Sequence, residues 1–223
     1  MKDFNLIIDF DSTFVKVEAL EKLAGIALND RADKQAVLDK IANITRLGMD
    51  GRIAFDESLE ERLKLIRIRK SHILELIDML KKNVTCSIME NAGFFRNQKN
   101  RAYIVSGGFV DFIWPVARDY GFKRSHILAN NFIFGDGGEV KGFDHSNPLS
   151  KAGGKALTAK KMNLKGKTYV VGDGYTDYEI KKSGIRCVFV AFTENIKRKP
   201  VMECVDFVVD DFNQFLYIVN NNL

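Results

Sequence analysis

Short runs of apolar residues alternate along the chain with longer segments in which apolar positions recur at helical spacing. The runs are continuous instead of alternating with polar residues, which is typical of strands buried on both faces of a parallel sheet. Strands that alternate with helices favour an α/β fold, in which helices cover a mainly parallel sheet. The strand-like runs lie at residues 5–10, 102–105, 168–171, 187–190 and 207–209.

A further strand is expected near residues 127–134, which precede Gly135-Asp136-Gly137-Gly138 and a second short segment at 139–143. Two such segments around a glycine-rich turn are typical of a β-hairpin. The third strand of the sheet is then either the first arm of this hairpin or a segment beside it. We expect the strand order 3-2-1-4-5 or a close relative of it.

The first two strand-like runs are separated by residues 11–101, far more than the roughly dozen residues that a crossover needs. Within this interval, apolar residues such as Leu59, Leu63 and Ile66 recur at helical spacing. We therefore predict a catalytic core formed by residues 1–15 and 83–223, and a small helical cap formed by residues 16–82 beside the end of the first strand.

The composition, with 46% hydrophobic and 28% charged residues, is ordinary for a globular protein. The net charge of +5 is scattered, and its densest runs, 67–70 and 197–199, are expected on solvated faces. No nucleic-acid motif accompanies it, so we expect no nucleic-acid partner. The three cysteines lack the spacing of a disulfide framework or a zinc site. Without a leader-like start or a long apolar run, we expect no membrane association and a cytoplasmic location.

Two carboxylates follow the first strand, in Asp9-Phe10-Asp11-Ser12-Thr13. Alternate side chains of a strand point the same way, so Asp9 and Asp11 can face one small volume. A hard cation such as Mg²⁺ would relieve their mutual repulsion and serve phosphate chemistry. In the alternative interpretation, Asp11-Ser12-Thr13 caps a helix that begins near Val15.

Two further strands end in similar chemistry. Ser106-Gly107-Gly108 follows the second strand, where backbone N–H groups at a helix start can bind phosphate; the alternative is a tight turn in which Ser106 is an N-cap. Asp173 and Asp177 follow the strand at 168–171 and can reach the same cation as Asp9. In the alternative interpretation, Thr176 or Asp177 caps the helix that follows. Because ligands bind at the carboxyl ends of parallel strands, we expect one assembled site there.

Phosphoryl transfer also needs a cation near the equatorial oxygens of the phosphate. Lys155 follows Gly153-Gly154 and opens a predicted helix that runs towards Met162. The alternative for any single lysine is a solvated surface charge. Lys155 is our candidate.

Together, Asp9-Phe10-Asp11-Ser12-Thr13, Ser106-Gly107-Gly108, a downstream lysine and Gly172-Asp173-Gly174 with Asp177 resemble the haloacid-dehalogenase-type (HAD) phosphohydrolases, and within them the phosphoserine phosphatases. The order of the motifs matches across most of the chain. The resemblance implies a Rossmann-like core with a helical cap inserted after the first motif. It also implies a Mg²⁺-dependent mechanism through an aspartyl-phosphate intermediate.

On this resemblance, Asp9 attacks phosphorus, and Asp11 protonates the leaving alkoxide and then activates water. The implied remaining roles are phosphate binding by Ser106, Gly107 and Gly108, charge screening by Lys155, and Mg²⁺ binding by Asp9, the backbone carbonyl of Asp11, Asp173 and the supporting Asp177. The second acid, Asp11, favours a phosphatase or phosphotransferase over a dehalogenase.

The cap residues imply the substrate. Glu18 matches the glutamate that meets the substrate ammonium in phosphoserine phosphatases, and Met49, Phe55 and Arg62 fall at spacings that resemble the family's cap residues. Arg62 would bind the substrate carboxylate with its planar fork. The alternative for Glu18 and Arg62 is a surface ion pair within a charged helical segment.

The sequence also departs from the family pattern. Tyr175 and Thr176 stand where many relatives have alanine and asparagine; Thr176 still donates a hydrogen bond towards substrate, while Tyr175 can reshape the pocket. Lys155 precedes Asp173 by 18 positions, fewer than is usual in the family. Lys151 fits that interval better but lacks the glycine context, so the lysine stays open between the two.

We expect an enzyme that hydrolyses L-phosphoserine to serine and phosphate in serine biosynthesis, with Mg²⁺ as cofactor, a small phosphorylated metabolite as partner, and a monomeric or homodimeric state. The alternatives are another phosphomonoester such as phosphoethanolamine or phosphohomoserine, phosphoryl transfer to a second alcohol, and a non-catalytic binding module on the same fold.

Overall fold

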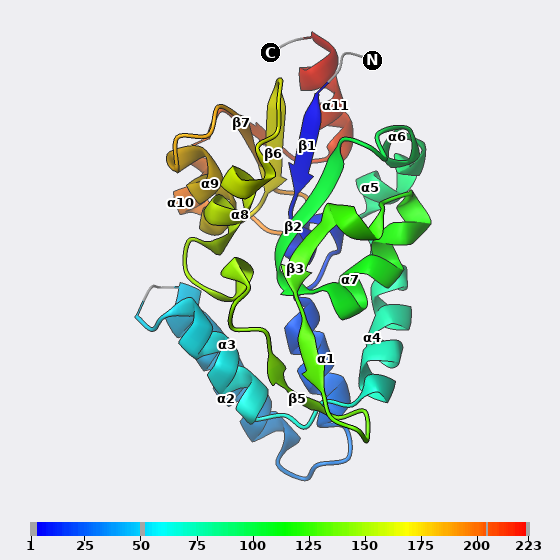
Figure 1. The fold of residues 1–223 in the computed structure, drawn as a ribbon, viewed down its shortest axis with the longest axis vertical. Coiled ribbons are helices and arrows are strands. Elements are labelled where there is room, and N and C mark those ends of the chain that lie inside the picture. The colour runs from blue at the N-terminus through cyan, green and yellow to red at the C-terminus, as the bar shows by residue number, and fades with distance from the viewer. Residues whose placement is uncertain (1–3, 50–51, 204, 222–223) are drawn as a thin grey trace.

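The computed structural model describes residues 4–49, 52–203 and 205–221. Within these ranges, six parallel strands form one sheet in the order β3-β2-β1-β6-β7-β8 (Figure 1). This confirms the predicted parallel α/β sheet and the order 3-2-1-4-5, to which the last strand adds an edge. The strands are β1 (Asn5–Ile8), β2 (Ala102–Phe109), β3 (Ile127–Asn130), β6 (Thr168–Gly172), β7 (Val188–Phe192) and β8 (Phe207–Val209).

Both faces of the sheet are buried, as the continuous apolar runs predict. Leu6 and Ile8 of β1 pack into one apolar cluster, which includes Phe14, and Ile7 packs into the other, which includes Phe189. The helices that follow the insertion are α5 (Cys86–Glu90), α6 (Ala92–Asn97), α7 (Val110–Ala117), α8 (Gly154–Met162), α9 (Tyr175–Lys182), α10 (Lys199–Met202) and α11 (Phe212–Asn221).

The predicted hairpin forms outside the main sheet, from β4 (Phe132–Phe134) and β5 (Val140–Phe143). Its first arm follows β3 directly, so the third sheet strand lies beside the hairpin and not within it. The N–H of Val140 donates to the carbonyl of Ile68, and the N–H of Lys70 donates to the carbonyl of Gly138. These bonds attach the hairpin to the helical insertion.

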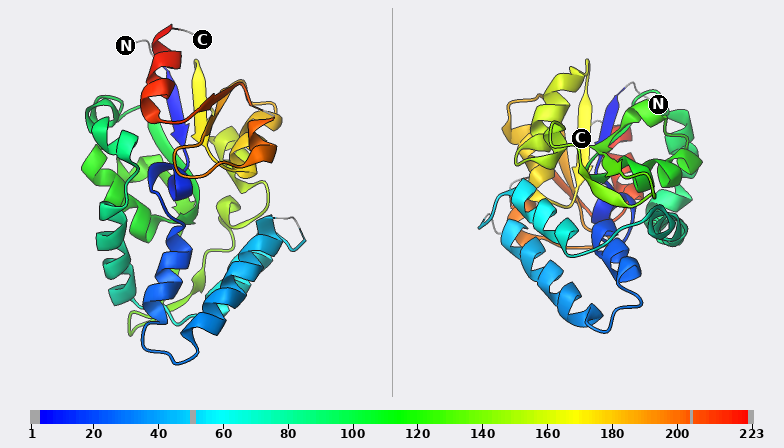
Figure 2. Two further views of the ribbon diagram at one scale, coloured as in Figure 1. Left: turned by 180° about the vertical axis from the view of Figure 1, so that it is seen from behind. Right: turned by 60° about the horizontal axis from the view of Figure 1, so that its bottom comes forward.

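The insertion between β1 and β2 contains α1 (Ala19–Ala27), α2 (Lys34–Met49), α3 (Phe55–Lys64) and α4 (Lys70–Lys82). Helices α2 and α3 run as a pair facing the carboxyl ends of the strands, whereas α4 lies along α7 (Figures 1 and 2). The two ends of the insertion lie side by side, because Lys16 donates from its N–H to Asn83 and Thr85 donates to Phe14. The division into a core and a cap with the predicted bounds stays a prediction.

No helix in the described part of the chain combines the length and the apolar character that crossing a membrane requires.

Phe14 lies at the centre of an aromatic cluster and is fully buried. Its ring centroid is 5.2 Å from that of Tyr120, 5.7 Å from that of Phe122 and 5.8 Å from that of Phe95. We expect Phe14→Ala to lower the free energy of unfolding by about 3–5 kcal/mol, since it leaves a cavity that the neighbouring rings cannot fill. Urea denaturation measures this loss. Tyr217→Ala is the control, because Tyr217 is 64% exposed and should change stability by less than about 0.5 kcal/mol.

Candidate active site

The chain leaves β1 in a wide turn, Phe10–Phe14, closed by a bond from the N–H of Val15 to the carbonyl of Phe10. Asp9 begins this turn and its Oδ1 accepts a 2.7 Å bond from the N–H of Phe10. No helix begins near Val15, contrary to the capping alternative; instead, Asp11 Oδ1 accepts from the N–H of Ala19, the first residue of α1, at 2.7 Å. The turn therefore ties the second carboxylate to the start of the helical insertion.

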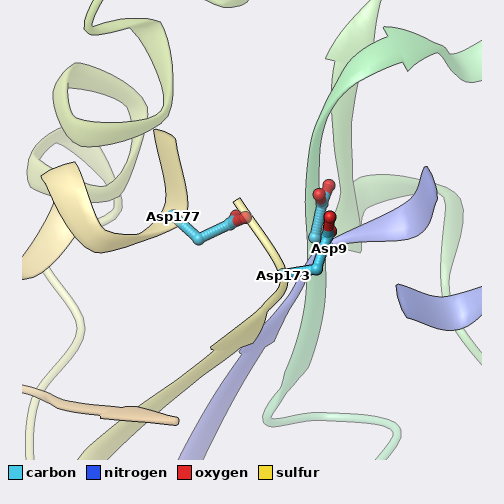
Figure 3. Close-up of side chains that lie close together, drawn as sticks. All are labelled: Asp9, Asp173 and Asp177. Atoms are coloured by element: carbon cyan, nitrogen blue, oxygen red, sulfur yellow. The ribbon is translucent and has the colours of Figure 1, made fainter. Parts of the chain in front are cut away.

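Three acidic side chains meet at the carboxyl edge of the sheet. Asp9 follows β1, Asp173 follows β6, and Asp177 lies in the first turn of α9 (Figure 3). One carboxylate oxygen of each lies within 4.8 Å of the others, and all three residues are buried. Ile8 pairs with Val171 across β1 and β6, so the register of the two strands sets the Asp9 and Asp173 carboxylates side by side.

Lys155 lies between two of these acids, with Nζ 2.8 Å from Oδ1 of Asp9 and 2.8 Å from Oδ1 of Asp177. Burial, followed by the charge of Asp9, raises the pKa of Asp177 to about 8. Burial also raises the pKa of Asp9, against the lowering effect of Lys155. For Lys155 itself, burial lowers the pKa, but the carboxylates of Asp177 and Asp9 raise it overall.

The carboxylates of Asp11 and Glu18 add to the negative charge of this acid cluster. Burial raises the pKa of Asp11 well above its usual range, and the nearby charge of Glu18 raises it further. Five acidic side chains thus lie near the two basic ones, Lys155 and Arg198. The five acids are Asp9, Asp11, Glu18, Asp173 and Asp177. An excess of buried carboxylate oxygens in one small volume is the donor set that a hard divalent cation prefers, so the cluster is compatible with a metal.

The structure separates the two lysine candidates. Lys151 is exposed, whereas the Lys155 side chain is only 10% exposed and points at the acids. Gly154 makes this approach possible, because a Cβ there would lie 2.1 Å from the carbonyl oxygen of Pro148. The geometry favours Lys155.

Ser106, Gly107 and Gly108 form a cradle beside the acids, defined here by these three residues. Strand β2 continues through them to Phe109, and Ser106 Oγ accepts a 2.9 Å bond from the N–H of Gly108. Ser106 does not cap α7, which begins at Val110 without a side-chain cap. A Cβ on Gly108 would lie 3.4 Å from Oδ2 of Asp11, so the Asp11 carboxylate faces the cradle.

A cavity of about 1080 Å³ joins the acids and the cradle to the helical insertion. Phe55 reaches the cradle from α3, since a Cβ on Gly107 would lie 2.9 Å from its Cζ. The predicted residues that line this cavity are Asp9, Asp11, Glu18, Phe55, Arg62, Ser106, Gly107, Gly108, Lys151, Lys155, Asp173, Tyr175 and Thr176. Asp177 lies just behind it, against Lys155 and Gly174. The side chain of Met49 lies outside the part of the structure that is described.

Among the described residues, neither Glu18 nor Arg62 pairs with an opposite charge in its own helical segment, as the alternative interpretation expects; Oε1 of Glu18 lies instead 3.6 Å from Nη2 of Arg198. Arg62 donates from Nε to the carbonyl of Ser58 at 3.1 Å and from Nη1 to Thr45 Oγ1 at 3.4 Å. Burial lowers the pKa of Arg62, opposed by the charges of Glu21 and Glu18. Glu18 accepts a 2.7 Å bond from Ser12 Oγ. Both residues line the cavity.

Arg198 is the site residue that sequence reasoning misses. Its run was expected on a solvated face, which is wrong for this residue: Nε lies 2.7 Å from Oδ2 of Asp173, and Nη2 lies 3.6 Å from Oε1 of Glu18. Nothing in the local pattern marks it, because Lys197 and Lys199 beside it have the same charge.

We expect Lys155→Met to lower the free energy of unfolding of the metal-free protein by about 3 kcal/mol at pH 8, since it leaves two buried carboxylates without their cation. Adding MgCl₂ should reduce this deficit, because a bound divalent cation neutralises the same acids. Thermal and urea unfolding with and without MgCl₂ measure both effects. Lys151→Met is the matched control and should unfold like the wild type; an equal loss in both variants would contradict the assignment.

Comparison with known proteins agrees with this geometry. Residues 5–183 match the model of the haloacid dehalogenase-like hydrolase family. The chain is 32% identical over 212 residues to the chloroplastic phosphoserine phosphatase of Arabidopsis thaliana, covering 93% of this chain and 69% of that protein. It is 29% identical to human phosphoserine phosphatase, covering 93% of this chain and 89% of the relative.

Solved structures show the same likeness. A phosphoserine phosphohydrolase-like protein from Francisella tularensis superposes with a TM-score of 0.85 at 31% identity, over 97% of this chain and all of that one (100%). A phosphoserine phosphatase solved as an analogue of its phospho-aspartyl intermediate superposes with a TM-score of 0.74 at 25% identity, over 97% of this chain and 99% of that one. With its motifs gathered in one cavity and its relatives matched along nearly its whole length, the chain belongs to the haloacid dehalogenase-like hydrolases and has the character of a phosphoric monoester hydrolase.

Proposed function

We propose that this enzyme hydrolyses L-phosphoserine to L-serine and phosphate, with Mg²⁺ as cofactor and through an aspartyl-phosphate intermediate. One observation carries the proposal: a single cavity is lined both by Asp9, Lys155 and the cradle and by Glu18 and Arg62. The first group suits a phosphate, and the second suits the ammonium and carboxylate of an amino acid. The small molecule that has all three groups is a phosphorylated amino acid.

Asp9 is the nucleophile in this proposal. Phe10 N–H and Lys155 Nζ both bind its Oδ1, which holds the carboxylate in one orientation. A fixed nucleophile beside a bound phosphate avoids much of the entropic cost of the reaction. Ser106 and the N–H groups of Gly107 and Gly108 hold the phosphate oxygens, and Lys155 screens the charge between phosphate and nucleophile.

Asp11 is the proposed acid and base. Its Oδ1 is occupied by the N–H of Ala19, while Oδ2 faces the cradle. From this position Asp11 can protonate the departing serine oxygen and then take a proton from the water that hydrolyses the intermediate. The bond to Ala19 also means that movement of α1 is coupled to the position of the acid.

Asp9, Asp173, the supporting Asp177 and the backbone carbonyl of Asp11 would hold Mg²⁺, since three of their carboxylates lie within 4.8 Å of one another. When bound, Mg²⁺ neutralises charge on the phosphate oxygens. Lys155 neutralises Asp9 and Asp177, and Arg198 neutralises Asp173. The protein thus balances the acid cluster with side chains that a cation can displace or supplement.

Substrate selection rests on Glu18 for the ammonium and Arg62 for the carboxylate, with Phe55 enclosing the carbon chain and Thr176 donating at the rim. A role for Met49 in the cap stays a prediction. Tyr175 also lines the cavity, but it is 46% exposed and its hydroxyl accepts from Lys182. A cytoplasmic location, a place in serine biosynthesis, and a monomeric or homodimeric state stay predictions.

In a phosphate-release assay over a panel of phosphomonoesters, phosphoserine should be the best substrate, ahead of phosphoethanolamine and phosphohomoserine. Chelation of divalent ions should abolish release and MgCl₂ should restore it, because the acid cluster then regains its cation. Asp9→Asn is the control for contaminating phosphatase. If phosphoserine ranks low, the substrate assignment is wrong; if Mg²⁺-loaded protein binds phosphate but releases none from any ester, a non-catalytic binding module is favoured.

Arg62→Met should raise KM for phosphoserine about 10- to 100-fold, since a charged hydrogen bond to carboxylate contributes about 1.5–3 kcal/mol. Phosphoethanolamine has no carboxylate, so its KM should change by less than about threefold by the same argument. Arg67→Met is the matched control, because Arg67 is an exposed arginine outside the cavity. Equal losses on both substrates would sink the role of Arg62 in carboxylate recognition.

A further inference from the structure

Strand β2 leaves its regular pairing with β3 where the cradle lies. Val105 pairs with Leu128 and Phe109 pairs with Asn130, so three residues of β2 stand opposite the single Ala129 of β3. Such a bulge releases backbone groups from the ladder and lets the strand bend outward. The cradle therefore needs some other group to fix its backbone.

The side chain of Asn130 supplies that group. Asn130 is the last residue of β3 and is fully buried. Its Nδ2 donates to the carbonyl of Gly107 at 2.9 Å and to the carbonyl of Leu149 at 3.2 Å. Since both neighbours are acceptors, the amide orientation is fixed by chemistry.

The bond to Gly107 bears on phosphate binding. In a trans peptide the C=O of one residue and the N–H of the next point in opposite directions. Holding the Gly107 carbonyl against Asn130 therefore aims the Gly108 N–H away from β3, towards Ser106 Oγ and the cavity. Without this bond, glycines on both sides would let the peptide rotate.

The bond to Leu149 bears on the lysine. Leu149 lies in the turn Pro148–Ser150, against which Gly154 packs at the start of α8. Asn147 makes the reciprocal tie, because its Nδ2 donates to the carbonyl of Ala129 at 2.8 Å. The end of β3 is thus bonded both to the cradle and to the turn that supports Lys155.

One feature separates Asn130 from an ordinary structural residue. Its Oδ1 is buried and has no hydrogen-bond partner among the described residues. A buried amide oxygen without a partner is unfavourable. The side chain is thus in place for its two donated bonds.

We propose that Asn130 is a positioning residue that orients the Gly107–Gly108 peptide for phosphate and holds it in register with the turn that carries Lys155. The inference rests on the proposed function in so far as the cradle binds phosphate. It assigns the rigidity of that cradle to a residue that does not line the cavity and does not touch the substrate.

The test measures the dissociation constant of inorganic phosphate by titration calorimetry in MgCl₂, together with kcat and KM. Asn130→Ala should weaken phosphate binding about tenfold, as expected when one hydrogen bond to a charged group is lost. Asn130→Asp should weaken it further, because a carboxylate would face two carbonyl oxygens. Asn147→Ala removes the two side-chain bonds of Asn147, to Ala129 and Leu149, but keeps the bond of Asn130 to Gly107. Its phosphate affinity should therefore stay within about threefold of the wild type. Asn131→Ala is the exposed neighbour control.

A folded Asn130→Ala protein that binds phosphate as the wild type does would overturn the proposal. Equal weakening in Asn130→Ala and Asn147→Ala would also overturn it, since that pattern indicates general loosening of the turn. If Asn130→Ala does not fold, Asn130→Leu, which has a similar volume and removes both donated bonds, is judged by the same criterion. Failure of the proposed substrate is a separate result, because it shows in the wild-type panel of esters and leaves phosphate binding unaffected.

Discussion

The structure depends on keeping several buried carboxylates together at one edge of a sheet. The carboxylates of Asp9, Asp173 and Asp177 have oxygens within 4.8 Å of one another. Charged carboxylates this close repel one another, and burial makes each carboxyl group harder to ionise. The molecule offsets this with Lys155, which lies between Asp9 and Asp177, and with Arg198, which lies against Asp173. Each cation comes from a different element of the chain than the acids it meets, and Lys155 reaches Asp9 from the other half of the chain. Formation of the site is therefore inseparable from assembly of the sheet and its helices.

The backbone makes this arrangement possible at a few positions where no side chain fits. A Cβ on Gly172 would lie 2.3 Å from Cγ of Asp177, so a glycine at the end of β6 is what lets Asp177 turn back under the strand. The parallel register of β1 and β6 then brings Asp9 and Asp173 together. The glycines around the acids in the sequence are thus part of the charge arrangement, and they keep the carboxylates within reach of one cation.

The features that could be predicted from the sequence are those with a local cause. Continuous apolar runs predict buried parallel strands, and acids or glycines directly after such runs predict a site at the carboxyl edge, as for Asp9 and Asp173. Lys155 could be preferred over Lys151 only in part, because glycine context favours Lys155 whereas the interval to Asp173 favours Lys151. The deciding facts are the contacts of Lys155 with Asp9 and Asp177 in the folded chain. The exact place of the third strand was open, since hydrophobic runs do not show where a sheet ends and a hairpin begins.

Arg198 and Asn130 escaped prediction for a different reason. Both act through bonds across the fold, Arg198 to Asp173 and Asn130 to Gly107 and Leu149. The sequence around Arg198 resembles an ordinary solvated charge run, and the sequence around Asn130 resembles an ordinary strand end. Their partners are backbone carbonyls or acids whose positions exist only after folding. A sequence motif can name the groups that meet the substrate, whereas the groups that hold a flexible glycine cradle rigid must be found from the hydrogen bonds of the folded chain. The rigidity is what makes backbone N–H groups effective at the phosphate, because donors that are already aligned need no reorganisation when charge develops there.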